Sequence, residues 1–165
     1  LHALVRRQRQ MCIRDSSFHA YPKDSLKYRE AEVYYKENKI ESPKWNGAVG
    51  KEQLSWLRKN LTAAEEKGEK VVLYCHFPVY PADPHNLWNA EEIISILEKF
   101  SCVKAYINGH NHKGAYGKKN GIHYLTLKGM VETELNAYST ISIHHDRLII
   151  DGHGRETDRS LLIRE

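Results

Sequence analysis

The sequence reads VVLYCHFP at residues 71–78 and VKAYINGHNH at residues 103–112, and these two stretches decide the fold. Each contains a run of β-branched and aromatic residues that stops near proline or glycine, which is the pattern of a buried strand. Each run also leads into histidine. Because His110 and His112 are two residues apart, an extended backbone would project both side chains to the same side.

The segment between these two expected strands has the pattern of a loop followed by a helix. Asn89 is expected to cap this helix with Glu92 as its capping-box partner. The order strand, loop, helix, strand favours parallel strands with a right-handed crossover. Binding sites in such sheets lie at the carboxyl ends of the strands, and neutral imidazole is the commonest protein ligand for metal ions. We therefore expect His76, His110 and His112 to meet in a metal site.

The remaining patterns suit a mixed α/β domain. A helix is expected near residues 26–38, and a second one carries leucines at helical spacing until Gly68 ends it. Residues 122–127 read as a short strand, and residues 139–150 read as an antiparallel hairpin that turns at Asp146 and Arg147.

The bulk composition indicates a single soluble domain. The chain has 165 residues, of which 41% are hydrophobic and 28% charged, as in ordinary globular proteins. Its formal charge of +4 comes mostly from arginines within residues 1–16, so the charge does not indicate a nucleic-acid partner. No apolar stretch approaches the ~20 residues that cross a bilayer, so no membrane partner is expected either.

Residues 1–16 are excluded from the expected domain, which covers residues 17–165. The run MCIRDS at residues 11–16 resembles the translation of a transposon-end adapter used in sequencing libraries, and a basic disordered leader is the alternative. The three cysteines form an odd set without short spacings, which favours reduced thiols and a cytoplasmic setting. Cys75 is expected to be a core thiol that faces away from His76.

The order of a strand ending in histidine and a strand ending in Gly-His-X-His resembles the C-terminal half of the calcineurin-like metallophosphoesterases. Further segments are similar to one branch, the manganese-dependent ADP-ribose/CDP-alcohol diphosphatases, across roughly residues 40–160. These segments are GAVGKEQLSWL at 47–57, LWN at 87–89, GHNHKG at 109–114 and DGHGR at 151–155, with Asp158 and Arg159 shortly after.

The resemblance implies a fold, a metal centre and a substrate class. The fold would be α/β, the C-terminal half of a four-layer α-β-β-α sandwich. Two divalent ions ~3.5–4 Å apart act on the phosphoryl group in such enzymes; manganese is expected, with iron, zinc or magnesium as other options. His76 and His110 would bind one ion and His112 the other. The substrate would be a nucleotide diphosphate, and candidate substrate contacts are Trp88, Asn89, Lys113 and Tyr116.

The chain departs from the family pattern upstream of His76. The family also needs an Asp-X-His, a Gly-Asp and a Gly-Asn-His-Asp/Glu motif there, and none occurs. Asp151-Gly152-His153 fits the first string, but it lies at the wrong end of the chain. We therefore expect a fragment without catalytic residues of its own. Three neutral histidines should bind at most one divalent ion loosely, and hydrolysis should be feeble or absent.

Several alternatives remain open at this point. The parent enzyme could act on a cyclic nucleotide or a phosphomonoester instead, or the histidines could hold one structural zinc in a non-catalytic domain. Trp88 and Asn89 could equally serve as a hydrophobic staple and a helix cap. His85 could contact substrate or be a solvated loop residue. Trp45 is expected to anchor the core, and His123 is expected to be a surface or hairpin residue. The oligomeric state is not predicted.

Overall fold

The computed structural model describes residues 22–163, so residues 1–16, expected to be an adapter artefact or a leader, lie outside the described residues. The described helices are α1 (Leu26–Glu37), α2 (Lys51–Glu66) and α3 (Ala90–Leu97). The strands are β1 (Val71–Tyr74), β2 (Val103–Asn108), β3 (Ala115–Lys119), β4 (Ile122–Thr126), β5 (Ala137–Ile143), β6 (Arg147–Gly154) and β7 (Arg159–Leu162). Within this part of the chain, no helix has the length and apolar character needed to cross a membrane.

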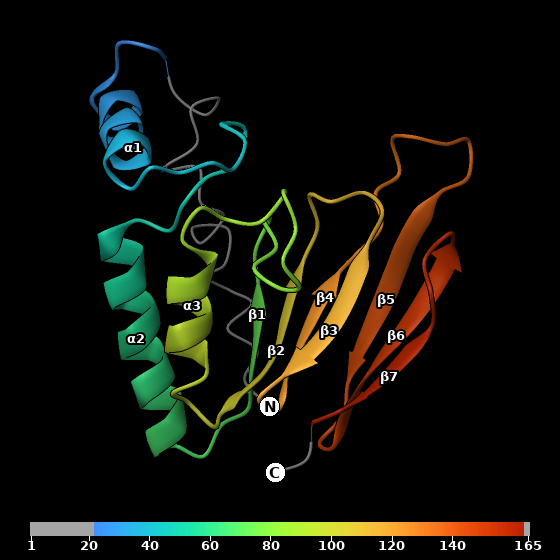
Figure 1. Ribbon diagram of the computed structural model, residues 1–165. Helices are drawn as coiled ribbons and strands as arrows, with labels where there is room; N and C mark the ends of the chain where they lie inside the picture. Colours follow the sequence, from blue (N-terminus) through green and yellow to red (C-terminus); the bar gives the residue numbers. More distant parts are fainter. Residues whose placement is uncertain (1–21, 164–165) are drawn as a thin grey trace.

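The central sheet has the strand order β1-β2-β4-β3. Strand β2 pairs in parallel with both β1 and β4, while β3 runs antiparallel to β4. The register places Tyr74 beside Ile107, so β1 and β2 end at the same edge of the sheet. The predicted parallel pair is therefore confirmed. Figure 1 shows that the loops leaving these strands gather at this edge.

The described part of the molecule has three layers. Helices α2 and α3 cover one face of the central sheet, and the antiparallel sheet β5-β6-β7 covers the other (Figure 1). One apolar cluster joins the helices to the sheet, and a second joins Val72, Ile107 and Leu125 to Leu148 and Ile150 of the second sheet. The α/β class is confirmed. Of the four predicted layers, residues 22–163 supply α-β-β, without a helical layer outside the second sheet.

The helix patterns identify α1, α2 and α3 correctly, but one predicted cap is wrong. Asn89 occupies the N-cap position of α3, but its side chain makes no hydrogen bond to the backbone of that helix. Its side chain instead accepts a hydrogen bond from Val49 N (2.9 Å) and donates one to Val49 O (3.0 Å). The long-range pair satisfies two backbone groups of the loop before α2, and this loop docking takes precedence over local capping.

Strands β3 and β7 were not predicted from the sequence. The signal for β3 was present, because Asn120 and Gly121 form the tight turn between β3 and β4 with φ values of 46° and 83°, and Asn-Gly favours that kind of turn. The expected surface position of His123 is also wrong. His123 is buried on β4, where its two ring nitrogens pair with Tyr116 Oη and Leu162 O, each at 2.8 Å.

Candidate metal centre

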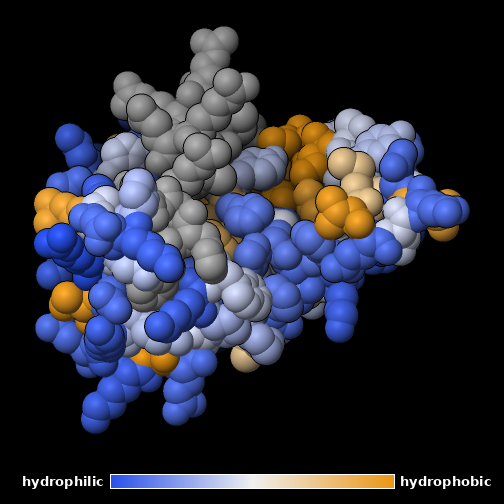
Figure 2. All heavy atoms as spheres, turned by 90° about the horizontal axis from the view of Figure 1, so that it is seen from above, coloured by the Kyte–Doolittle hydropathy of each residue, from blue (hydrophilic) through white to orange (hydrophobic). Residues whose placement is uncertain are grey.

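A pocket of about 330 Å³ opens where β1, β2 and β4 end. His76, His110 and His112 all line it, together with backbone and side chains of the strand ends and of the segment 127–129. Seen from this end, the largest gathering of hydrophobic side chains lies toward the sheets, and most of the remaining surface is hydrophilic (Figure 2). The three histidines predicted to converge therefore face one shared pocket.

The closest pair in this pocket is His76 and His110, whose Nε2 and Nδ1 atoms are 3.1 Å apart. His76 lies two residues beyond the end of β1. His110 adopts φ 69°, so the Gly-His-X-His segment is a tight turn and not the extended backbone assumed from the sequence. The sharp bend lies at His110 itself and not at Gly109. The histidines converge because of this turn, which a hydrogen bond from Gly109 N to His76 O ties to the first strand.

The second nitrogen of the His110 ring has its own partner. His110 Nε2 lies 3.1 Å from Oδ1 of Asn46, a residue with 0% exposure. Phe77 packs edge-on against the same ring at 4.4 Å between centroids. The ring is therefore held on two sides, with Nδ1 directed toward His76.

His112 is held in a similar way from the other side of the pocket. Its Nδ1 lies 3.2 Å from Oε1 of Glu132, an exposed carboxylate that the sequence reading did not single out. A side chain at position 129 would collide with the His112 ring, because a Cβ there would lie 2.6 Å from His112 Cδ2. Gly129 thus leaves the space that the imidazole fills, and Nε2 of His112 is the nitrogen left for a ligand.

Burial and mutual repulsion favour neutral histidines in this pocket. Burial, together with the charges of His76, His85 and His112, lowers the pKa of His110 to about 4. Burial and the charge of His112 also lower the pKa of His76. A metal ion binds imidazole only through an unprotonated nitrogen, and both rings are neutral at neutral pH, so each has one such nitrogen.

The donor set suits one loosely bound divalent cation. Two nitrogens bound to one ion at about 2.1 Å and at right angles would be about 3 Å apart, close to the observed separation of His76 and His110. Among the described residues, however, no three His, Cys, Asp or Glu side chains are arranged to hold a metal ion by themselves. His76 and His110 are therefore not a complete metal site by themselves.

A second network borders the pocket, and sequence reasoning mostly missed it. Asp83 accepts hydrogen bonds from His85 N, from His85 Nδ1 at 2.6 Å and from Asn111 Nδ2 at 3.1 Å. Burial alone would raise the pKa of Asp83, but the hydrogen bonds from His85 outweigh it and lower that pKa. Asn111 Oδ1 also accepts a hydrogen bond from Lys113 N at 3.1 Å, which fixes the conformation of its loop. The Asp-Pro-His sequence at 83–85 indicated a turn, because an aspartate side chain often accepts a hydrogen bond from the backbone N–H two residues further along the chain.

Trp45 is part of this border and not of the core. It is 39% exposed, and its ring packs against those of His85 and His110 with centroids 4.9 and 5.2 Å apart. The expectation that Trp45 anchors the core is therefore wrong. No periodic pattern surrounds Trp45, so only the folded loop reveals its position.

The four candidate substrate residues do not line the histidine pocket. Trp88 donates from Nε1 to Pro43 O and packs edge-on against Tyr35 of α1. Asn89 is buried against Val49. Lys113 is exposed near Asp83, and Tyr116 pairs with His123. The substrate contacts stay predictions, and the structure gives Trp88 and Asn89 clear structural tasks.

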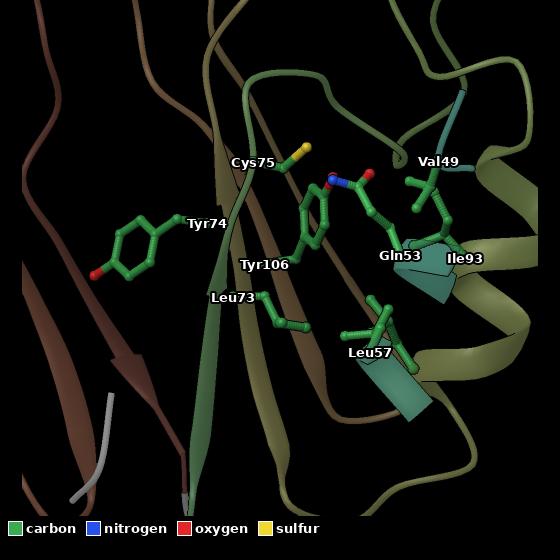
Figure 3. A pocket seen from close by; sticks show the side chains of 9 residues that line it. Val49, Gln53, Leu57, Leu73, Tyr74, Cys75, Ile93 and Tyr106 are labelled. Atoms are coloured by element: carbon green, nitrogen blue, oxygen red, sulfur yellow. The ribbon is translucent and has the colours of Figure 1, made fainter. Parts of the chain in front are cut away.

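An apolar cavity lies behind the pocket, between α2, α3 and the central sheet (Figure 3). It measures about 20 Å³, which is room for a single water. Figure 3 shows the Cys75 sulfur on this side of β1 and Tyr74 on the other. Cys75 packs against the apolar cluster here, in keeping with the predicted core thiol. The cavity is too small for a substrate.

The chain resembles known enzymes in sequence, although no protein-family model matches it. It is 40% identical to the manganese-dependent ADP-ribose/CDP-alcohol diphosphatase of Xenopus tropicalis, over 73% of this chain and 37% of that protein. The human protein of the same name is 33% identical over 70% of this chain and 35% of its own length. The chain therefore spans little more than a third of the length of these curated relatives.

Solved structures with a similar fold include a phosphatase. The crystal structure of a dimetal phosphatase from Danio rerio superposes with a TM-score of 0.81 at 29% identity, covering 91% of this chain and 55% of that one. The anchor in the inner membrane complex of Plasmodium matches with a TM-score of 0.52 at 12% identity, covering 66% and 41% of the two chains. The second likeness concerns the fold alone.

Proposed function

Because this chain is homologous to the manganese-dependent ADP-ribose/CDP-alcohol diphosphatases over about 70% of its length, we propose that it is the C-terminal part of a metal-dependent phosphoesterase. The observation that carries the proposal is the facing pair of ring nitrogens on His76 and His110, 3.1 Å apart in a pocket that His112 also lines. In this account the pair binds one divalent ion, manganese first among the candidates, and His112 is a ligand of a second ion.

The described residues supply the binding half of this chemistry. Bound divalent ions in such pairs polarise phosphoryl oxygens and furnish a hydroxide nucleophile. The protein's own part is to keep imidazoles neutral and oriented. His110 is oriented by Asn46 and His112 by Glu132, and each keeps one ring nitrogen for a ligand.

The same residues explain why the chain alone should be a poor enzyme. Two divalent ions held by three neutral imidazoles carry about four uncompensated positive charges, and their repulsion opposes the second ion. Glu132 and Asp83 already pair with His112 and His85, respectively. We therefore propose that the parent protein supplies carboxylates from outside this chain, and that this chain by itself hydrolyses substrate feebly or not at all.

The proposed substrate of the parent protein is the pyrophosphate of ADP-ribose or of a CDP-alcohol, the substrates in its relatives' names. Other phosphoesters, such as a cyclic nucleotide or a simple monoester, are the first alternative. A structural zinc site is the second, but such sites are usually rich in cysteine. Cys102 is buried before β2, where Sγ lies 3.8 Å from Leu61 O, and so belongs to the opposite end of the sheet. A cytoplasmic setting remains part of the proposal.

A hydrolysis panel tests the proposal. The full chain, and the chain extended by its upstream reading frame, are each given Mn²⁺ with ADP-ribose, a CDP-alcohol, a cyclic nucleotide and a phosphomonoester. We expect the extended protein to cleave the diphosphates preferentially and the chain alone to be nearly inactive. A preference for the monoester or the cyclic nucleotide would contradict the substrate, and a tightly bound zinc with four ligands would favour the non-catalytic alternative.

A further inference from the structure

We propose that Asn46 is a positioning residue that selects the Nε2–H tautomer of His110 and so presents the bare Nδ1 to the pocket. The tautomer assignment stands on hydrogen bonds alone. Its consequence for metal binding rests on the proposed function, in which His110 is a ligand. Asn46 comes from the loop before α2, far from His110 in the sequence, and no motif for metal ligation includes it.

The orientation of the Asn46 amide is fixed by its second contact. Asn46 is fully buried, and its Nδ2 donates to the carbonyl oxygen of Pro84 at 2.6 Å. Only the amide nitrogen can donate to a carbonyl, so Oδ1 must be the atom that faces His110 Nε2 at 3.1 Å. Because Oδ1 only accepts, the ring nitrogen opposite it must carry the proton.

The proton on Nε2 determines the state of the other nitrogen. A neutral imidazole has one N–H group, so Nδ1 of His110 carries a lone pair. This lone pair points at His76 Nε2, 3.1 Å away. Without a cation, His76 donates its Nε2–H into that lone pair. If His76 takes its other tautomer, two lone pairs face one gap, which is the arrangement a divalent ion requires.

The alternative tautomer would close the site. With the proton on Nδ1, His110 could donate to His76, and the lone pair would turn toward the buried side where Asn46 lies. Burial of an unpaired Nε2 beside Asn46 Oδ1 would set two acceptors against each other, which costs free energy. Asn46 therefore acts on metal binding through His110, in the way that hydrogen-bond partners of metal-bound histidines commonly do.

The chain offers a matched control for this role. Asn89 anchors the same loop through its two hydrogen bonds to Val49, yet no hydrogen bond joins it to His110 among the described contacts. If Asn46 only docked the loop, loss of either asparagine should have similar consequences. If Asn46 selects the tautomer, only its loss should change the His110 ring.

The first measurement is the tautomer of His110 in the metal-free full chain, read from ¹⁵N resonances of labelled histidine above the ordinary histidine pKa. The wild type should show protonated Nε2 and unprotonated Nδ1. Asn46→Ala should give a mixture or the reverse tautomer, whereas Asn89→Ala should keep the wild-type pattern. Asn46→Asp, which keeps an acceptor oxygen, should show the wild-type tautomer of His110. This variant also tests the proposal if Asn46→Ala does not fold. Unchanged resonances in Asn46→Ala, or equal changes in Asn89→Ala, would overturn the proposal.

The second measurement is a Mn²⁺ titration of the same proteins. Asn46→Ala should weaken binding by about 10- to 100-fold, the usual effect of losing such a partner, and Asn89→Ala should stay within about twofold of the wild type. Equal losses in both variants would indicate loop docking only and contradict the positioning role. A wild type that binds no Mn²⁺ while showing the expected tautomer would contradict the proposed function and leave the tautomer assignment standing.

Discussion

The two ends of the central sheet carry polar clusters of opposite character. Before β2 begins, the Glu65 carboxylate accepts hydrogen bonds from Ser101 N, Ser101 Oγ and Cys102 N at 2.7–3.0 Å. Where β1 and β2 end, His76 and His110 turn ring nitrogens toward each other across an open pocket. At the first end both carboxylate oxygens accept hydrogen bonds, and at the second end two ring nitrogens pair with each other beside a pocket.

The end of the sheet that carries Glu65 has a structural role. The hydrogen bonds from Ser101 and Cys102 lower the pKa of Glu65 to about 2. Burial, aided by Glu65, raises the pKa of Cys102 to about 12, so this thiol stays protonated and unreactive. A cluster whose members satisfy one another stabilises the fold and offers a ligand little. The histidine cluster instead faces a pocket, and cation binding there is the proposal that the variants below test.

The largest expected effect is a loss of stability when the apolar cluster that supports both ends of the central sheet is disturbed. Leu61 has 0% exposure in α2, one turn before Glu65. Leu61→Ala should lower the free energy of unfolding by about 3 kcal/mol, because it removes buried contacts and leaves a cavity. Urea denaturation measures this, with Val33→Ala on the exposed side of α1 as a control expected within ~0.5 kcal/mol. A loss below ~1 kcal/mol would show that Leu61 contributes little to the apolar cluster on which both ends of the sheet rest.

The next effect is a loss of stability at His123, a structural histidine that does not line the pocket of His76, His110 and His112. His123 has both ring nitrogens paired, with Tyr116 and Leu162. His123→Leu should cost about 1–2 kcal/mol of stability, since two hydrogen bonds are lost and the Leu162 carbonyl is left unpaired. Mn²⁺ affinity of the folded variant should be unchanged. Weaker Mn²⁺ binding in this variant would contradict the assignment of His123 to a structural role separate from the cation pocket.

The smallest effect is a pH dependence at the structural end. The pKa of Glu65 is lowered in the folded chain, so its stabilising effect is complete above the ordinary pKa near 4.5 and is lost as the pH falls toward 2. Glu65→Gln should cost about 1 kcal/mol at neutral pH, the usual scale for such hydrogen bonds. The gap between wild type and variant should close between pH 4.5 and 2. A gap that stays constant across this range would show that the carboxylate charge does not matter.

Much of the fold could be predicted from local patterns. The strands around residues 71–76 and 103–108, the helices and the hairpin near Asp146 follow from apolar periodicity, and all are present in the structure. Strand β3 was missed although Asn120-Gly121 marked its turn. The capping role of Asn89 was wrong because a backbone partner forty residues away competed with the local one. Local sequence cannot show such partners, since only folding brings them together.

The convergence of the three histidines on one pocket could be predicted from the sequence, but their surroundings could not. Strand ends and the Gly-His-X-His spacing indicated His76, His110 and His112, and all three line one pocket. Their assumed extended geometry was wrong, because His110 turns at positive φ. The supporting residues Asn46, Trp45 and Glu132 lie on loops without periodic signals. Their roles depend on contacts across 20 to 65 residues of sequence, which no local pattern encodes.

The position of the cation site can be measured from the order in which histidine signals of the full chain broaden when Mn²⁺ is added well below one equivalent. Paramagnetic broadening falls steeply with distance, so the first resonances to disappear mark the cation site. We expect the signals of His76, His110 and His112 to vanish first, while those of His144, His145 and His153 on the β5–β6 hairpin persist. First loss at the exposed His145, which lies beside Asp146, or uniform loss at all of these histidines, would contradict a cation pocket at the strand ends.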